Sequence, residues 1–146
     1  MLFIGSDHGG LEMKEELVKV LTSRNLPVED CGTTNGDSVD YPDFAEKVAG
    51  AVSRGEAELG ILVCGTGIGM SIVANKFAGV RAALVHDEFT AQMAKEHNNA
   101  NILVLGGRIL SVEQGVKLVE IWLDTTFAAG RHQNRLLKIS AAEQNQ

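Results

Sequence analysis

Residues 62–71, LVCGTGIGMS, end an apolar run in Cys64 and follow it with Gly65, Gly67 and Gly69 at alternate positions. A glycine-rich loop that opens a helix presents backbone N–H groups to negative charge. A helix N-terminus also favours the thiolate form of a cysteine. By position alone, Cys64 is equally well a small core residue. The glycines shift the balance toward a catalytic thiol on an anion-binding loop.

Three other phosphate-binding patterns fit this loop poorly. The dinucleotide fingerprint needs glycine or alanine where Met70 stands and belongs after a first strand, although Asp87 lies near the ribose-binding distance. A Walker A loop needs Gly-Lys-Ser/Thr, but Gly69 is followed by Met70 and Ser71. A cysteine-phosphatase loop needs an arginine near Met70 to bind phosphate, and the sequence has none there.

Two further segments carry groups for proton transfer. Asp7 and His8 stand in GSDHGG, where Asp7 is equally well a helix cap and His8 points to where a phosphate would lie. His97 and Asn98 stand in EHNNAN at the expected end of a helix. There, a favourable C-terminal charge and a cap are the simpler interpretation.

Residues 130–135, GRHQNR, contain a candidate phosphate clamp. Arg131 and Arg135 share one helical face, and neither has an acidic partner at that spacing. Together with His132, in an acidic protein, they favour phosphate binding over a merely solvated surface. We expect structural roles for Cys31, His86 and Trp122.

The composition excludes several classes of function. The net charge is −6 without a block of like charges, and aromatic residues make up 5%, so we expect no nucleic-acid partner. No apolar stretch approaches the ~20 residues of a membrane span, and no signal peptide is evident, so we expect a cytoplasmic protein with free thiols. The histidines and cysteines lack metal-ligand spacing, so no metal site is expected.

The segments that position these residues alternate between short apolar runs and amphipathic stretches. The runs cover residues 1–5, 26–32, 59–65, 80–86 and 101–107. The expected helices cover residues 11–24, 42–55, 66–77, 88–97 and 111–123. Pro42 suits a helix start, and Ser111 with Gln114 forms a plausible capping box. Residues 130–144 predict an extra C-terminal helix with a polar tail that frays.

Continuous apolar runs are typical of a parallel sheet that is covered on both faces. We therefore predict an α/β fold in a single domain, residues 1–146: a three-layer, Rossmann-like α/β/α sandwich with a five-stranded parallel sheet. Ligands bind at the carboxyl ends of such strands. The residues at those ends are Asp7, His8, Cys64–Gly69, His86, Asp87 and Gly106–Arg108.

This set of groups fits one reaction that needs no cofactor, the aldose–ketose isomerisation of a sugar phosphate. It contains a thiol base, the hydroxyl of Thr66, backbone N–H donors, an aspartate, two histidines and arginines for phosphate. A base removes the proton next to the carbonyl, and N–H groups stabilise the resulting enediolate. An acid–base pair is needed first, to open the cyclic sugar.

The chain resembles the B-type ribose-5-phosphate isomerases, in the family that also holds galactose-6-phosphate isomerase. The resemblance covers nearly the whole chain. It is carried by GSDHGG, DCGT, DYPDFA, CGTGIGMSIVANK, GVRAALVHD, EHNNANIL and GRHQNR. The combination of CGTGxG with ANK and a later GRH is specific to that family.

The resemblance implies a role for each residue of the glycine loop. Cys64 matches the base that takes the C2 proton. Part of the family instead uses a glutamate at the place of Met70, so this chain is of the cysteine type. Thr66 matches the hydroxyl that moves a proton between the sugar oxygens. The Gly65–Gly69 backbone, helped by Asn98, matches the anion hole.

The resemblance also implies roles outside the loop. Asp7 and His97 match the ring-opening pair, and Tyr41 lines the substrate. The residues matching phosphate contacts are His8, Arg108, Arg131 and Arg135. The family is dimeric with a site between subunits, so His97, Asn98 and Arg108 are expected from the partner chain of a homodimer, or of a tetramer.

The expected activity is the interconversion of ribose 5-phosphate and ribulose 5-phosphate, a step of the pentose phosphate pathway. His97-Asn98 and GRHQNR favour this substrate over the alternatives, galactose 6-phosphate and allose 6-phosphate. The length of the pocket would separate a pentose phosphate from a hexose phosphate, and the sequence does not give that length. A non-catalytic phosphate- or nucleotide-binding module is the alternative from another class.

Overall fold

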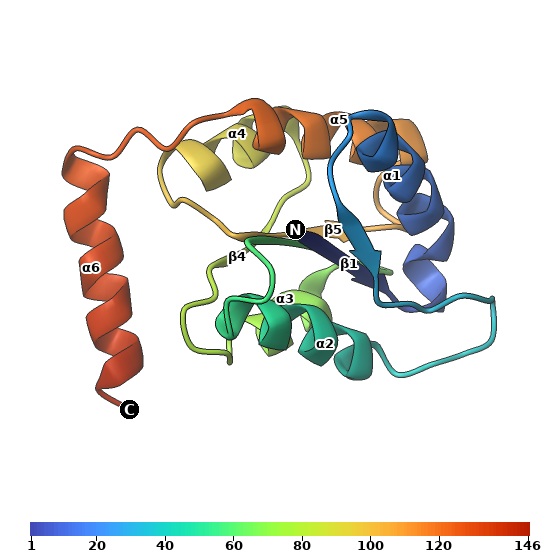
Figure 1. Cartoon of the computed structure of the whole chain (residues 1–146), viewed down its shortest axis with the longest axis horizontal. Helices are drawn as coiled ribbons and strands as arrows, with labels where there is room; N and C mark the ends of the chain where they lie inside the picture. Colours follow the sequence, from blue (N-terminus) through green and yellow to red (C-terminus); the bar gives the residue numbers. More distant parts are fainter.

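Five parallel strands form one sheet in the computed structural model, which describes residues 1–146 (Figure 1). The strands are β1 (Leu2–Ser6), β2 (Val28–Asp30), β3 (Leu59–Cys64), β4 (Ala82–Leu84) and β5 (Ile102–Gly106), in the spatial order β2-β1-β3-β5-β4. The two edge strands, β2 and β4, have only three residues each and are shorter than the predicted 26–32 and 80–86. An edge strand pairs on one side only, so fewer residues are held in the extended conformation.

Two layers of helices cover the sheet, as predicted. α1 (Leu11–Ser23), α4 (Glu88–Glu96) and α5 (Val112–Asp124) lie on one face, and α2 (Tyr41–Ser53) and α3 (Ile68–Ala74) on the other (Figure 1). Right-handed crossovers explain this division. The β1-to-β2 and β4-to-β5 connections run in one direction across the sheet, whereas the β2-to-β3 and β3-to-β4 connections run in the opposite direction.

The three inner strands are buried on both faces. Ile61 and Leu103 point into a cluster that contains Trp122, and Leu62 and Val104 point into a second cluster on the opposite face. The Trp122 indole Nε1 donates to the carbonyl of Ala100, which confirms its structural role. The sandwich predicted from continuous apolar runs is therefore confirmed.

Local signals set the helix ends. The capping box at Ser111 and Gln114 is confirmed at the start of α5. Pro42 occupies the second position of α2, which begins at Tyr41. α3 is shorter than the predicted 66–77, because Gly67 adopts a left-handed conformation before it and the side chain of Asn75 bonds the backbone of Ala82 after it.

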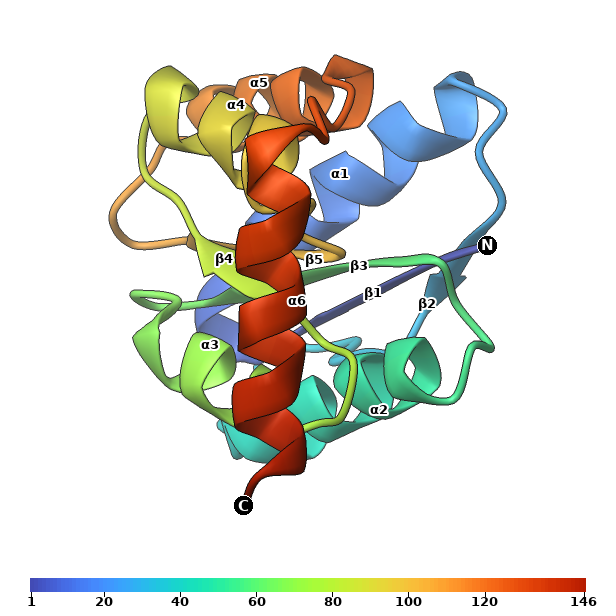
Figure 2. The ribbon, with the colours of Figure 1, turned by 90° about the vertical axis from the view of Figure 1, so that its left-hand side faces the viewer.

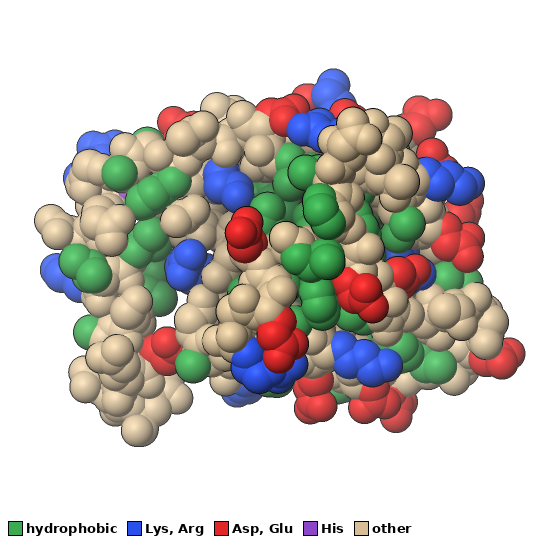
Figure 3. Space-filling model, viewed as in Figure 1, with side chains coloured by type: hydrophobic (Ala, Val, Ile, Leu, Met, Phe, Trp, Pro, Cys, Tyr) green, Lys and Arg blue, Asp and Glu red, His purple; other side chains and the backbone are tan.

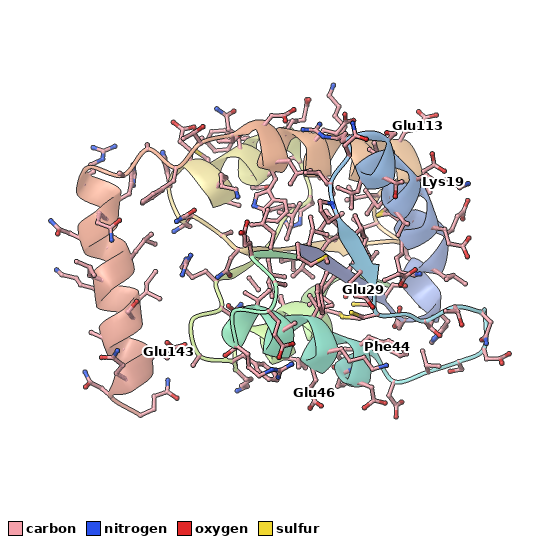
Figure 4. All side chains as sticks on the ribbon, in the orientation of Figure 1. Lys19, Glu29, Phe44, Glu46, Glu113 and Glu143 are labelled. Atoms are coloured by element: carbon pink, nitrogen blue, oxygen red, sulfur yellow. The ribbon has the colours of Figure 1, made fainter.

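The predicted C-terminal helix, α6 (Arg131–Gln144), stands beside the sandwich and crosses the side of the sheet formed by its outer strand β4 (Figure 2). The helix continues to Gln144, so the polar tail is largely helical. Glu143 lies on the side of α6 that faces the sandwich, where its carboxylate accepts from the amide of Gly79 at 2.9 Å (Figure 4).

No helix of this structure combines the length and the apolar character that crossing a bilayer requires. On the face drawn in Figure 3, acidic and basic side chains are interspersed, so this face has no continuous basic surface of the kind that binds nucleic acid.

Candidate active site

Cys64 is the last residue of β3 and is 5% exposed. Its side chain packs with the second core cluster, and its Sγ accepts from the amide of Gly67 at 3.2 Å. The residue therefore combines both interpretations that position alone allowed. It fills the core, and its sulfur meets a backbone donor of the glycine loop.

The turn after Cys64 requires glycine at position 67. Gly67 has a φ of 82°, and a Cβ there would stand 2.5 Å from the Leu84 side chain and 3.1 Å from the Leu105 backbone. Any larger residue would strain the backbone and push the loop away from β5. The glycine thus fixes the amide that donates to the sulfur.

Backbone donors of the same loop remain free to bind an anion. The amide of Ile68 donates to Thr66 Oγ1, but the amides of Gly65, Thr66 and Gly69 donate to no acceptor of the protein. The first N–H groups of a helix lack intrahelical partners. Three unpaired donors beside a thiol form the kind of arrangement that binds an oxyanion.

Two side chains flank the loop. A Cβ on Gly69 would stand 2.3 Å from the ring of Tyr41, and one on Gly65 would stand 3.4 Å from Arg108 Cδ. The Arg108 amide also donates to the Gly65 carbonyl at 2.9 Å. The β5–α5 turn therefore carries Arg108 to the Cys64 loop of its own chain, away from His97 and Asn98, with which the expected partner-chain contribution grouped it.

Asp7 and His8 lie on the neighbouring strand end, because Ser6 of β1 pairs with Val63 of β3. Asp7 is 8% exposed, and its Oδ1 accepts from the Gly9 amide at 2.9 Å, which confirms the cap. The second oxygen has no partner in the chain. His8 Nδ1 accepts from the amide of Val39 at 3.2 Å, so the ring proton of neutral His8 is assigned to Nε2, a donor suited to phosphate.

His97 and Asn98 lie at the amino ends of the strands, which we call the second edge. The carboxyl ends, which carry Cys64 and Asp7, are the first edge. α4 starts after the end of β4 and runs back along the sheet, and His97 caps its C-terminus. A few residues later, the Asn101 amide donates to the Arg81 carbonyl at 3.1 Å, directly before β4 and β5 begin. One chain therefore does not bring His97 to Cys64.

The start of α6 joins His97 at this second edge. The rings of His97 and His132 are stacked, with centroids 4.1 Å apart and planes 15° apart. His132 is 7% exposed, and burial lowers its pKa, helped by the positive charges of His97, Arg131 and Arg135. His132 is therefore buried, unlike the two arginines with which the expected phosphate clamp grouped it. Arg131 and Arg135 are exposed and have no carboxylate partner.

Two residues weighed for other roles are accounted for locally. The Asp87 carboxylate accepts from the amide of Thr90 at 2.7 Å in a capping box, and this bond lowers the pKa of Asp87. That carboxylate is thus engaged where a dinucleotide ribose would need it. Burial raises the pKa of the Cys31 thiol, helped by Glu29 and Asp30. The chain also contains no group of three or more potential metal ligands.

One contact network was not predicted from the sequence. The Lys14 ammonium is 2% exposed and donates to Asp30 Oδ2 at 2.6 Å, while Asp30 Oδ1 accepts from the Gly32 amide at 2.9 Å. This network anchors the loop 31–40, which carries Val39 to His8 and leads into Tyr41. Its contacts link residues 16 and 31 positions apart, so no local sequence signal marks them.

Comparison with known proteins agrees with this geometry. Residues 2–139 match the model of the Ribose/Galactose Isomerase family. Ribose-5-phosphate isomerase B of Escherichia coli is 44% identical over 96% of this chain and 94% of its own length. The structure of the Mycoplasma genitalium ribose-5-phosphate isomerase B with bound ribulose 5-phosphate superposes with a TM-score of 0.96 and 43% identity, covering 99% of this chain and 97% of that one. The structure of Clostridium thermocellum ribose-5-phosphate isomerase B superposes with a TM-score of 0.96 and 47% identity, covering 99% of this chain and 97% of that one.

Proposed function

The chain belongs to the ribose/galactose isomerase family, and from this premise we propose that it interconverts ribose 5-phosphate and ribulose 5-phosphate through an enediolate, without a cofactor. The observation that carries the proposal is the thiol of Cys64 beside three unpaired amides of one loop. The reaction is a step of the pentose phosphate pathway. We place it in the cytoplasm, because its charged sugar phosphates do not cross membranes freely.

The isomerisation uses the Cys64 loop. The thiolate of Cys64 takes the proton from C2 of the open-chain aldehyde, and the negative charge moves to O1. The free amides of Gly65, Thr66 and Gly69 stabilise that oxyanion. The Thr66 hydroxyl passes the O2 proton to O1, and Cys64 returns its proton to C1, so that a carbonyl remains at C2.

Ring opening precedes this step and needs two groups on opposite sides of the anomeric carbon. The free oxygen of Asp7 takes the proton of the O1 hydroxyl while the bond between C1 and the ring oxygen breaks. His97, as imidazolium, gives a proton to the departing O4. His8, Arg131 and Arg135 bind the phosphate, as their donors and unpaired charges suit them to do.

Asp7 and His97, the two groups for ring opening, lie at opposite ends of the strands in one chain, so the complete site needs a second copy. In a two-fold symmetric dimer, the same pair of surfaces meets twice and forms two composite sites. Exposed apolar side chains around the Cys64 loop support such an interface. They are Ile68 (54% exposed), Ile72 (56%) and Ile109 (62%).

The decisive test of the activity is incubation with ribose 5-phosphate in D2O, followed by proton NMR. We expect ribulose 5-phosphate with deuterium incorporated from the solvent, and neither conversion nor exchange with Cys64→Ala. Cys31→Ala is the matched control, because Cys31 is a free thiol outside the site and its loss should leave the rate unchanged. Conversion only of a six-carbon sugar phosphate would reassign the substrate. Binding without any exchange would favour a non-catalytic module.

Mixing two inactive variants tests the composite site. In a dimer of Cys64→Ala with His97→Asn, one site carries both changes and the other carries none. Random exchange of subunits makes half of the molecules heterodimers, so about a quarter of the wild-type activity should return. If each site lies within one chain, the mixture stays inactive.

A further inference from the structure

The stacked pair at the second edge shows how the orientation of His97 is determined. His97 ends α4 as its C-cap, where no side-chain hydrogen bond fixes its ring. The ring of His132, from the first turn of α6, covers it at 4.1 Å. The Ala128 amide, just before α6, donates to the Glu96 carbonyl at 2.9 Å and joins the two segments. The His132 ring is thus the contact that defines the plane of His97.

The environment of His132 favours packing over hydrogen bonding. Its side chain is 7% exposed, whereas Arg131 and Arg135 on the same helix are exposed. The charged groups around its ring are His97 and Glu96 from α4 and the two arginines from α6. Three of these four are basic, so His132 is held neutral near pH 7. A neutral ring presents an aromatic plane to its neighbour, and it does not compete with His97 as a second acid.

We propose that His132 is a positioning residue, which holds the His97 imidazole in the plane required to protonate the ring oxygen of the cyclic sugar. This inference rests on the proposed function, in which His97 is the acid of ring opening. His132 itself touches neither the sugar nor its phosphate. Its effect is confined to the step that His97 performs.

The chemistry of the two substrates separates that step from the isomerisation. Ribose 5-phosphate is mainly cyclic and must be opened. Ribulose 5-phosphate is acyclic, because its O5, the atom that would close a ring onto C2, carries the phosphate. Exchange of a C1 proton of ribulose 5-phosphate with D2O therefore needs Cys64 and the anion-binding loop but no ring opening.

Three variants divide the possible roles of His132. His132→Phe keeps an aromatic ring, His132→Leu keeps volume without a ring, and His132→Gln keeps a hydrogen-bond donor without a ring. The neighbouring exposed position provides the control, Gln133→Ala. For each protein, we would measure kcat and KM from ribose 5-phosphate and the rate of C1 deuterium exchange in ribulose 5-phosphate.

We expect His132→Leu and His132→Gln to lower kcat from ribose 5-phosphate by about tenfold, because a misplaced acid loses its alignment with the departing oxygen. KM and the exchange rate should stay within about twofold of wild type. His132→Phe should restore most of the loss, and Gln133→Ala should match wild type.

Other outcomes would overturn the proposal. A rise of KM for both substrates that Gln but not Phe prevents would make His132 a phosphate ligand. Equal losses of conversion and exchange in all three variants, or no loss in any, would remove the link to ring opening. Failure of the proposed function would differ from all of these, because wild type itself would then show neither conversion nor exchange.

Discussion

The edge of the sheet where the strands end and the edge where they begin carry different kinds of functional group. At the first edge, Cys64 and Asp7 are 5% and 8% exposed, and backbone amides hold both side chains. At the second edge, Asn98, Arg131 and Arg135 are exposed, and they lie close to the end of α4 or the start of α6. In the proposed reaction, Cys64 and Asp7 transfer protons and need fixed positions, whereas the long side chains of the arginines can adapt to a phosphate.

This difference predicts where a substitution alters the chemical step and where it alters binding. Changes at the strand ends should lower kcat and disturb the fold, because the same atoms serve both. Changes at the arginines should weaken binding and leave the fold intact.

The largest effect is expected at Gly67. Gly67→Ala places a Cβ 2.5 Å from Leu84 at a φ of 82°, so the amide that donates to Cys64 must move. The neighbouring amides of Thr66 and Gly69, which are proposed to bind the oxyanion, would move with it. We therefore expect kcat to fall by about 10²–10³-fold, the range for a lost oxyanion donor. Gly79→Ala is the control, because Gly79 has a φ of 77° with no atom near its Cβ position. It should cost about 1 kcal/mol of stability and leave kcat unchanged. Equal kinetics for the two variants would contradict the prediction.

The next effect concerns the loop that Lys14 anchors at the first edge. Lys14→Met leaves the Asp30 carboxylate without its partner, and we expect unfolding in urea to require about 3 kcal/mol less free energy. This figure is at the low end for a buried pair, because Asp30 is 36% exposed. Lys19→Met removes an exposed pair with Glu16 and should cost under about 0.5 kcal/mol. Similar losses for both would show that the buried pair does not anchor the loop.

A smaller and purely kinetic effect is expected at Arg135. Arg135→Ala should raise KM for ribose 5-phosphate by about tenfold, since a hydrogen bond to a charged group contributes about 1.5–3 kcal/mol. The melting temperature should not change, because Arg135 is exposed and unpaired. Lys138→Ala, one turn further along α6, is the matched control and should leave KM unchanged. A large loss of kcat at constant KM would place Arg135 in the chemistry instead.

The smallest effect is a dependence of stability on pH. Because the folded protein lowers the pKa of His132, mainly by burial, the unfolded chain binds this proton more tightly. The stabilisation is therefore complete above the unfolded pKa of about 6.5 and is lost as pH falls below it. Urea unfolding at one protein concentration should show a larger decrease between pH 7.5 and pH 5 for wild type than for His132→Phe. Equal decreases would mean that His132 titrates as in the unfolded chain.

The first edge was predictable from the sequence because its signals are local. An apolar run that ends in Cys64 and glycine marks both a strand end and its loop, and Asp7 followed by Gly9 marks a cap. The topology then brings these ends together without further information. What the pattern could not supply was the side of the loop on which Arg108 would lie. That depends on the pairing of Gly106 with Cys64 across the sheet.

The second edge was less predictable. The cap position of His97 and the unpaired arginines follow from helix spacing, but the burial of His132 depends on where α6 docks beside α4. At the first edge, the bond from Val39 to His8 is the exception, because it spans 31 residues and likewise needs the folded chain. The composition of this edge could be listed from the sequence, whereas its contacts could not.

The placement of the two groups of residues at opposite edges also links activity to the amount of protein. A single chain holds two incomplete sites that cannot reach each other across the sheet. In the proposed dimer, dilution below the dissociation constant should therefore abolish activity while every chain stays folded. Specific activity should fall with concentration and return on reconcentration, so expression level would control the rate per molecule as well as the total rate.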